Sequence, residues 1–415
     1  MSGTETNKVL ASDFTQLGTK PPFGEECLIL LPNRISEPDL SILTEEISAT
    51  KSKPILLIDS SHSRKNELGI DSNDPDVAEF DFNSGSDEEL RSIIEPFRNK
   101  ENTIIFIPAK TSVKNGANFH FPSKSLRKIL GLGIPTIPLF IESVSETKLS
   151  IDKEKGTIHS YGEILREGNL IIPSFQESLL EAGEKAFSSH GIFNDSLPYS
   201  IIKGLKNYGS KTSIFDGNDG TEFVFTKVFA AAAALSRIIR KETQKNRVGI
   251  VLTPGKGGLV ANLAVLLSGK IPVNLNFTAG SDAVNSSIEQ ADLDKIITAG
   301  AFVEKYPGFP WPNDEKILFI EKILPDLKKK KKITLWFIAL KVFSPKRLAK
   351  MLGIAEKGGD EEAVLLFTSG SSGNPKGVVL THRNILANVS QFGSRLELSN
   401  EDKILGCLPL FHSFG

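Results

Sequence analysis

Short apolar runs alternate with amphipathic stretches along most of the chain. Four runs in the first 150 residues are rich in Ile, Leu and Val and are bounded by turn residues, which predicts buried strands. They lie at 26–32, 53–59, 103–109 and 135–142. Amphipathic stretches at 87–99 and 122–133 predict helices between them. This alternation of strand and helix predicts an α/β fold with a largely parallel sheet.

A second series of the same kind begins near Pro173. It contains an alanine-rich helix at 226–242, a strand–helix–strand unit at 247–277 and two strands around a glycine-rich loop. The segment from 145 to 168 shows neither pattern and predicts a return of the chain to the surface. We therefore expect a first αβ domain at 1–150, a linker at 151–172 and a second, mostly parallel domain at 173–415.

Composition places the chain among ordinary globular proteins. It has 415 residues, of which 40% are hydrophobic and 24% charged, and a net charge of −1. That charge argues against a general nucleic-acid binder, which would usually be basic. The two cysteines, Cys27 and Cys407, are isolated, so no disulfide framework or metal-binding spacing is expected. A reducing cytoplasm is the simple interpretation.

Membrane contact is left open by one feature. No apolar run approaches the roughly 18 residues that a membrane span needs. Five consecutive lysines at 328–332 nevertheless precede the apolar stretch 333–343. Such a pair could contact anionic lipid at the inner face of the membrane as a peripheral site. We favour a solvated charged turn beside a core helix.

The most informative stretch is FTSGSSGNPKGVVLTHRN, residues 367–384. Glycines let backbone N–H groups approach an anion, hydroxyl groups add donors, and a lysine adds a point charge. The stretch is not a Walker loop, because Pro375 and Gly377 stand where Gly and Ser or Thr are required. The segment 253–260 fails as a dinucleotide fingerprint at Val260. We favour polyphosphate binding over a plain hairpin turn.

This stretch resembles the phosphate-binding signature of the adenylate-forming (AMP-binding) ligases, which include acyl-CoA and acyl-[acyl-carrier-protein] synthetases. The segment LPLFHSFG at 408–415 is similar to the next motif of that family. The resemblance covers about residues 170–415. It implies that ATP and Mg²⁺ activate a fatty acid as an acyl-adenylate. The acyl group then passes to a thiol of acyl carrier protein or CoA.

The resemblance also assigns residues. It implies catalytic roles for Lys376 and for His412 in the acyl pocket, with an ordinary loop histidine as the less favoured interpretation of His412. It implies no protein ligand for the metal among them. The positions that match phosphate contacts are Thr368, Ser369, Gly370, Ser371, Ser372, Gly373, Lys376 and Gly377.

The first domain resembles the glycerolipid acyltransferases, but its motif is degenerate. Arg34 stands where that family has its catalytic histidine, Asp39 matches the orienting aspartate, and Ala109 replaces an acid. An arginine has no lone pair to accept a proton, so Arg34 cannot act as the base. His62 and His120 do not lie in a matching context. We expect an acyltransferase-like scaffold without transfer chemistry.

The order of the two halves resembles the bifunctional 2-acylglycerophosphoethanolamine acyltransferase/acyl-[acyl-carrier-protein] synthetases. Ligases of this family normally continue beyond the point that corresponds to Gly415. We therefore expect an incomplete adenylating domain that shows no ATP–pyrophosphate exchange on its own. The alternatives are a pseudoenzyme that binds acyl carrier or nucleotide and, less favoured, a glycerophospholipid acyltransferase. Acyl chain length, thiol acceptor and oligomeric state stay open.

Overall fold

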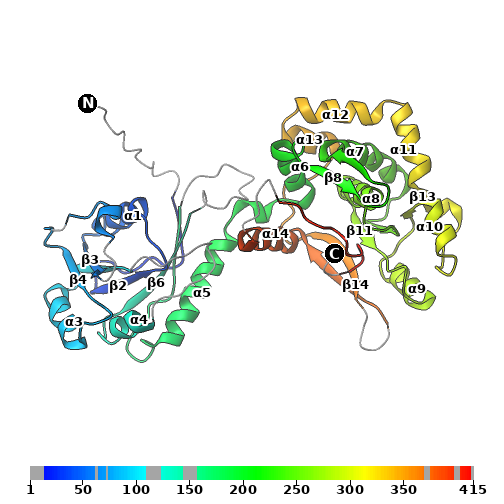
Figure 1. Ribbon diagram of the computed structural model, residues 1–415. Helices are drawn as coiled ribbons and strands as arrows, with labels where there is room; N and C mark the ends of the chain where they lie inside the picture. The colour runs from blue at the N-terminus through cyan, green and yellow to red at the C-terminus, as the bar shows by residue number, and fades with distance from the viewer. Residues whose placement is uncertain are drawn as a thin grey trace, which may run out of the picture. The chain divides into compact units, whose positions relative to one another are not determined.

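The computed structural model describes residues 14–60, 64–71, 73–108, 123–143, 157–368, 374–396 and 402–412. The chain divides into two compact units, each with its own sheet (Figure 1). Unit 1 comprises Met1–His190 with Ser394–Glu397, and unit 2 comprises Gly191–Gly393 with Leu398–Gly415. Both sheets are mostly parallel and covered by helices, so the predicted α/β fold is confirmed.

Unit 1 is built on a seven-stranded sheet in the order β1-β7-β6-β2-β5-β3-β4. All neighbouring pairs are parallel except β6 and β7, which are antiparallel. The strands are β1 (Phe14–Leu17), β2 (Leu28–Pro32), β3 (Lys53–Asp59), β4 (Val77–Phe80), β5 (Asn102–Ile107), β6 (Thr136–Ser143) and β7 (Thr157–Tyr161). The helices are α1 (Glu37–Ser48), α2 (Lys65–Leu68), α3 (Asp87–Ile94), α4 (Ser123–Leu130) and α5 (Ile172–Ser188).

The central strand β2 shows why the apolar runs form buried strands. All five of its residues are buried. Leu28 and Leu30 pack in the core cluster that contains residues of α1, whereas Ile29 and Leu31 pack in the cluster that contains residues of α3, α4 and α5. A strand covered on both faces needs apolar side chains at every position, so its sequence is continuous rather than alternating.

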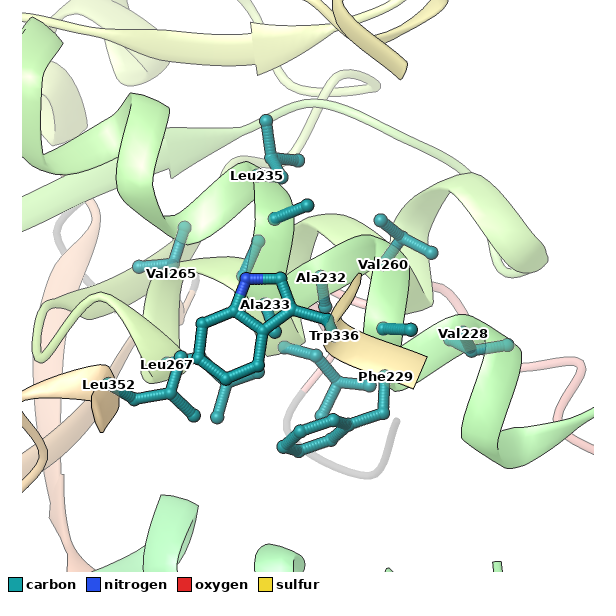
Figure 2. Close-up of a cluster of buried hydrophobic side chains, with 14 of the residues drawn as sticks. Val228, Phe229, Ala232, Ala233, Leu235, Val260, Val265, Leu267, Trp336 and Leu352 are labelled. Atoms are coloured by element: carbon teal, nitrogen blue, oxygen red, sulfur yellow. The ribbon is translucent and has the colours of Figure 1, made fainter. Parts of the chain in front are cut away.

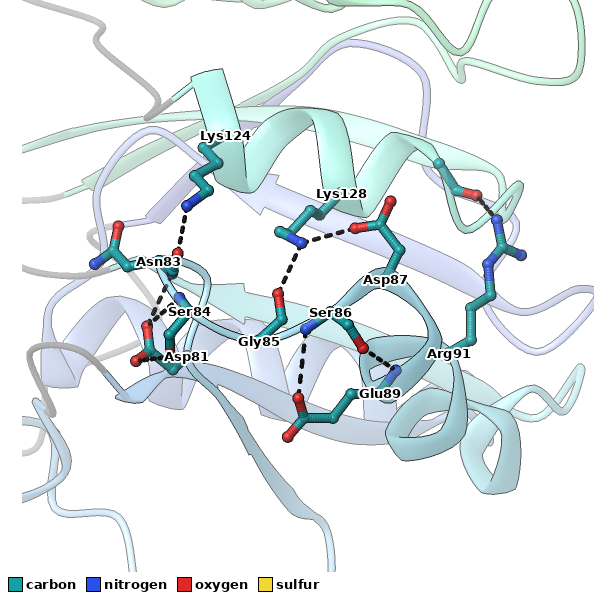
Figure 3. A network of polar contacts seen from close by, with 11 residues as sticks. Asp81, Asn83, Ser84, Gly85, Ser86, Asp87, Glu89, Arg91, Lys124 and Lys128 are labelled. Carbon is teal, nitrogen blue, oxygen red and sulfur yellow. Dashed lines mark hydrogen bonds and ion pairs between the residues drawn. The ribbon is translucent and has the colours of Figure 1, made fainter.

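A polar network fixes the loop before α3 to helix α4 (Figure 3). Ser86 caps α3 and forms a capping box with Glu89. The Lys128 ammonium donates to the Gly85 carbonyl oxygen at 2.9 Å and to Asp87 Oδ1 at 2.7 Å. A side chain at Gly85 would collide with the Phe80 ring, 2.4 Å from the ideal Cβ position. The loop is therefore held by side chains on both of its sides.

The division between the units falls after His190, beyond the linker expected at 151–172. Two elements account for the difference. Strand β7 pairs with both β1 and β6, and helix α5 packs against β6 and β7. The segment expected as a linker therefore contributes a strand to the first sheet. Where the expected domain boundaries fall outside the described residues, they stay a prediction.

Unit 2 has a six-stranded sheet in the order β13-β12-β10-β11-β14-β15, in which only β14 and β15 are antiparallel. A separate hairpin is formed by β8 and β9. The strands are β8 (Ser213–Asp216), β9 (Thr221–Val224), β10 (Arg247–Ile250), β11 (Ile271–Asn274), β12 (Ile296–Thr298), β13 (Ile317–Phe319), β14 (Glu362–Thr368) and β15 (Lys376–Thr381). The helices are α6 (Leu197–Tyr208), α7 (Phe225–Glu242), α8 (Lys256–Leu267), α9 (Ser281–Gln290), α10 (Gly300–Lys305), α11 (Ile320–Lys329), α12 (Lys332–Val342), α13 (Pro345–Leu352) and α14 (His382–Leu396).

The main core of unit 2 lies between α7, α8 and α12 (Figure 2). Ala230, Ala232 and Ala233 of α7 are fully buried and allow α8 to pack closely against it. Trp336 of α12 joins the same cluster beside Phe229.

Within the described part of the chain, none of the helices is long and apolar enough to cross a membrane.

Candidate nucleotide-binding site

The predicted phosphate loop connects two paired strands. β14 and β15 are antiparallel, and the last residue of β14, Thr368, lies directly opposite the first residue of β15, Lys376. Phe367 pairs in the same way with Gly377. The register therefore brings a hydroxyl and an ammonium group to the two ends of one loop, as the spacing in the sequence requires.

Both of these side chains are exposed. Within the described ranges, no carboxylate forms an ion pair with Lys376, which leaves its charge available to an anion. A Cβ at Gly377 would come within 3.3 Å of Leu365 Cδ1 and 3.4 Å of Phe367 Cε1, so a larger residue would crowd the strand pair. The other predicted phosphate contacts, Ser369, Gly370, Ser371, Ser372 and Gly373, lie outside the described residues.

The loop is anchored on the side of β15 by a residue that sequence analysis missed. The Gln290 side chain, at the end of α9, donates from Nε2 to the Pro375 carbonyl oxygen at 3.1 Å. It also donates to Ser286 Oγ at 2.9 Å, which orients the amide group. No sequence signal points to this contact, because a glutamine at a helix end has no specific pattern.

The beginning of β14 is held by an ion pair across the sheet. Arg247 at the start of β10 donates from Nε to Glu362 Oε1 at 2.9 Å and from Nη2 to Oε2 at 2.8 Å. Strand β11 lies between these two strands. The hydrogen bonds to Glu362 raise the pKa of the Arg247 guanidinium, so it stays charged. The bidentate pair fixes one end of β14 while the loop occupies the other.

Helix α14 begins directly after β15, and its first turn is capped. The Thr381 N–H donates to Asn384 Oδ1 at 3.0 Å, and the Asn384 N–H donates to Thr381 Oγ1 at 3.1 Å. Thr381 is therefore the residue that caps the helix. His382 Nδ1 instead accepts a hydrogen bond from the Leu197 N–H at 3.0 Å. Burial lowers the pKa of His382, against a smaller opposite effect from Glu361.

The described part of the second predicted motif, residues 408–412, lies at the same edge of the sheet as the loop between β14 and β15. β14 runs parallel to β11, so Thr368 lies at the edge where the carboxyl ends of the parallel strands meet. Phe411 packs edge-to-face on Phe277, which follows β11, with 5.2 Å between ring centroids. Ligands of open α/β sheets bind at this edge. The His412 side chain is exposed there, and the backbone N–H of His412 donates to the Pro409 carbonyl oxygen.

An aromatic cluster surrounds this contact, and sequence analysis did not single it out. Phe277 contacts both Phe302 and Tyr306, with ring centroids 5.0 Å and 4.9 Å away. Phe302 and Tyr306 are one helical turn apart on α10 and its end, so their spacing is a weak helical signal. The cluster gives the segment 409–412 an apolar surface to lie on.

Protein ligands for a metal are a separate question. In the part of the chain that the structure describes, no group of three or more His, Cys, Asp or Glu side chains is arranged to hold an ion. Mg²⁺ in nucleotide sites is commonly bound through substrate phosphates, water and one or two carboxylates. The exposed hydroxyl and ammonium groups at the loop fit a polyphosphate, which would carry such an ion with it.

In unit 1, the structure places the degenerate acyltransferase positions in and around α1. Arg34 lies between β2 and α1, and Asp39 lies in the first turn of α1. Ala109 lies outside the described residues. Asp39 is buried and accepts hydrogen bonds from Ser36 Oγ at 2.6 Å and Thr157 Oγ1 at 2.9 Å.

The histidine near Asp39 is one that the sequence did not suggest. His159 on β7 is fully buried, with Nε2 3.8 Å from Asp39 Oδ1. This distance is too long for a hydrogen bond, and neither ring nitrogen of His159 has a hydrogen-bond partner. The Phe14 ring packs edge-on against the imidazole. The pair is enclosed rather than presented to a substrate.

Comparison with known proteins tests the interpretation of unit 2. A family model described as AMP-binding enzyme matches residues 203–415, just over half of the chain. The chain belongs to the AMP-binding enzyme family. The match contains the β14–β15 hairpin, its loop and the segment up to His412. The predicted family is thereby confirmed.

Several curated relatives carry ligase or synthetase names. A 4-coumarate--CoA ligase-like protein of Arabidopsis thaliana is 25% identical over 53% of this chain and 39% of its own. Fatty acyl-CoA synthetase A of Dictyostelium discoideum is 27% identical over 41% and 26%. A chloroplastic long-chain-fatty-acid--[acyl-carrier-protein] ligase of Arabidopsis thaliana is 42% identical over 13% and 8%. The matches therefore span at most about two fifths of these relatives.

Proposed function

We propose that this AMP-binding protein takes part in activating a fatty acid with ATP and ligating it to a thiol. The carboxylate would attack the α-phosphate of ATP, giving an acyl-adenylate and pyrophosphate, and the thiol would then take the acyl group and release AMP. The observation that carries the proposal is the hairpin that sets Lys376 opposite Thr368 within the region matched by the family. Mg²⁺ would neutralise part of the charge on the phosphates.

The roles of the residues in unit 2 follow from their places. Lys376 would bind the β- and γ-phosphates as a point charge, and Thr368 would donate its hydroxyl at the other end of the loop. The five loop residues from Ser369 to Gly373 would add backbone and hydroxyl donors. His412 and the aromatic cluster around Phe277 would border the acyl group. These roles are proposals for this chain.

The acid and the thiol are the finer part of the proposal. Two of the relatives have names that refer to fatty acids. The thiol acceptors in these names are CoA and acyl carrier protein. The name of the 4-coumarate--CoA ligase-like relative makes an aromatic acid the alternative candidate for the substrate. A fatty acid is favoured because the surface beside His412 is apolar and aromatic.

Nucleotide binding is tested first, by equilibrium dialysis of labelled ATP against the full chain with and without Mg²⁺. Lys376→Gln should weaken binding by about tenfold or more, since it removes a charge-assisted contact to phosphate. Lys316→Gln is the matched control, because Lys316 is an exposed lysine on a 3₁₀ turn of the same unit. Equal ATP affinities in the wild type and Lys376→Gln would contradict the proposal that this loop binds the phosphates of ATP.

Chemistry is tested by trapping the acyl-adenylate with hydroxylamine. Any hydroxamate that forms should come from long-chain fatty acids in preference to 4-coumarate, and CoA or acyl carrier protein should compete with hydroxylamine for the acyl-adenylate. ATP binding that depends on Lys376 without any hydroxamate would favour a pseudoenzyme that only holds nucleotide. Hydroxamate from 4-coumarate alone would keep the ligase and overturn the choice of fatty acid.

A further inference from the structure

Helix α12 is apolar on an outer face as well as on the face that packs on the core. Trp336, Ala339 and Leu340 are buried, and α12 packs on α7. On the other face Leu335, Ile338 and Val342 are 64%, 51% and 67% exposed. Their spacing places them in one stripe along the helix. Figure 1 shows α12 as the outermost helix over α7 in this unit.

The stripe lies in a strongly basic part of the chain. Residues 327–355 contain eight lysines and one arginine and no Asp or Glu. The overall net charge is −1, so this segment holds a local excess of positive charge. Five of the lysines, Lys328–Lys332, follow one another where α11 ends and α12 begins, and all five are exposed.

Few acids neutralise this charge. Lys330 forms an ion pair with Asp326 at 2.8 Å, and Lys346 lies 3.9 Å from Glu356. Among the described residues, no ion pair is formed by Lys328, Lys329, Lys331 or Lys332. At the other end of the stripe, Lys341 lies over the Phe337 ring and Arg347 over the Phe343 ring. Cations therefore border the apolar stripe at both ends.

We propose that the outer face of α12, with the lysine run Lys328–Lys332, docks on an anionic lipid bilayer. The apolar stripe would enter the boundary between headgroups and acyl chains, and the lysines would bind the headgroup charges. The proposal does not depend on adenylation activity. It makes the apolar stripe and the cations parts of one surface.

The composition of the surface favours a bilayer over a protein partner. Protein interfaces are depleted in lysine and enriched in arginine and aromatic anchors. Here eight of the nine cations are lysines, and the exposed apolar residues are Leu, Ile and Val. A bilayer demands no particular geometry of the charges, and each lysine near an anionic leaflet strengthens binding by roughly fivefold.

The test is flotation of the full chain with vesicles of phosphatidylcholine alone or mixed with phosphatidylglycerol. The wild type should float with the mixed vesicles, should not float with the neutral ones, and should lose binding as salt is raised from about 0.1 M to about 1 M. A triple variant, Leu335→Ser, Ile338→Ser and Val342→Ser, should bind at least tenfold more weakly. A second triple variant, Lys328→Gln, Lys329→Gln and Lys332→Gln, should do the same.

Matched controls separate the surface from bulk properties. Lys211→Gln, Lys227→Gln and Lys241→Gln remove the same charge from exposed positions elsewhere in unit 2. Ile171→Ser, Leu180→Ser and Val389→Ser remove three other apolar side chains that are 52%, 65% and 54% exposed. Both controls should bind within twofold of the wild type. Tryptophan fluorescence checks that the variants on α12 keep Trp336 in its core.

Three outcomes would overturn the proposal. The first is a wild type that does not float with the anionic vesicles. The second is an equal loss in the test and control variants, which would indicate overall charge or hydrophobicity as the cause. The third is a change from dimer to monomer in the serine variant, measured by sedimentation, with vesicle binding unchanged. That result would assign the stripe to a contact between two copies of the chain.

Discussion

Asp39 and His159 lie 3.8 Å apart in the interior of unit 1, measured from Oδ1 to Nε2. In the acyltransferase resemblance, Asp39 is the residue that would orient a catalytic histidine at position 34. Here its carboxylate accepts hydrogen bonds from Ser36 and Thr157 instead. It thereby caps α1 and ties that helix to β7. The structure gives Asp39 a use in stability that does not require transfer chemistry.

Replacing Asp39 should therefore destabilise unit 1. Burial raises the pKa of this carboxyl group, but contacts with His159, Ser36 and Thr157 outweigh it and hold the pKa below its usual range. Asp39→Ala removes the carboxylate half of the Ser36–Asp39 capping box and leaves the Thr157 hydroxyl without this partner. The expected loss is about 2–4 kcal/mol of unfolding free energy. Urea unfolding followed by far-UV circular dichroism measures it.

The position of the tryptophans makes this measurement specific. Trp311 and Trp336 are the only tryptophans of the chain, and both lie in unit 2. Asp39→Ala should thus shift the circular dichroism transition and leave the fluorescence transition in place. The pKa of Asp39 is lower in the folded chain than in the unfolded chain, where it is about 3.9. The contribution of Asp39 to the unfolding free energy is therefore present above about pH 3.9 and is lost as the pH falls through the folded pKa. An unchanged acid transition in Asp39→Ala would contradict this account.

Two adjacent glycines of α8 should respond in opposite ways to the same substitution. A Cβ at Gly258 would lie 2.5 Å from the Thr253 carbonyl oxygen and 2.6 Å from Leu410 Cδ1, whereas a Cβ at Gly257 would meet nothing within 4 Å. Gly258→Ala should cost about 1–3 kcal/mol, because backbone and the segment 409–412 must shift. Gly257→Ala should be neutral or stabilising by up to about 1 kcal/mol.

Urea unfolding followed by tryptophan fluorescence compares the two glycine variants directly. If Gly258→Ala also displaces Leu410, it should weaken ATP binding more than Gly257→Ala does. Equal stability of the two variants would mean that the close packing of α8 against the segment 409–412 is absent in solution.

The apolar pattern predicted most of the sheets because parallel strands are buried on both faces. It did not predict β7, whose sequence TIHSY contains one aliphatic residue although all five positions are buried. Thr157 there bonds to Asp39, and His159 packs against Phe14, so polar side chains are accommodated by partners distant in the chain. The pattern of residues along one strand cannot reveal such partners. Because β7 was not predicted, the first domain was expected to end at residue 150, before this strand.

The site was predictable to a similar extent and for similar reasons. The glycines, hydroxyl groups and Lys376 form a local pattern, so the hairpin and the family followed from the sequence. Gln290 and Arg247 support the same hairpin from other elements. Their roles depend on the order of strands in the sheet, which the sequence does not display.

The ion pair between Arg247 and Glu362 should be measurable as a coupling energy. Its two charge-assisted hydrogen bonds lie on side chains that are 27% and 21% exposed. A double-mutant cycle with Arg247→Gln and Glu362→Gln should give about 1–3 kcal/mol. The control cycle is Lys245 and Asp292, a more exposed pair of the same unit, which should give at most about 1 kcal/mol. Equal coupling in both cycles would show that Arg247 does not anchor β14.

The last prediction concerns His382 and the acid sensitivity of unit 2. Its Nδ1 accepts a hydrogen bond from Leu197 N–H, so the other nitrogen carries the proton of the neutral ring. The ring also lies against Gly358, whose added Cβ would come within 2.3 Å of His382 Cδ2. Protonation would place a hydrogen on Nδ1, where it would face the Leu197 N–H donor. The neutral form is therefore the one that fits.

The sign of the pH dependence follows from the lowered pKa of His382. In the unfolded chain the histidine titrates near its ordinary value of about 6.5, whereas in the folded chain it takes up a proton only at lower pH. Its stabilising contribution is thus present above about pH 6.5 and is lost as pH falls through the folded value. His382→Asn keeps an acceptor for the Leu197 N–H and removes the titration.

Tryptophan fluorescence in urea, recorded from about pH 8 to about pH 5, should show a smaller loss of stability in His382→Asn than in the wild type. His412→Asn is the matched control, because it replaces an exposed histidine of the same unit by the same residue. If His382→Asn and the wild type lose stability in parallel, another group of unit 2 is responsible for its acid sensitivity. In that case the hydrogen bond between Leu197 and His382 does not select the neutral ring.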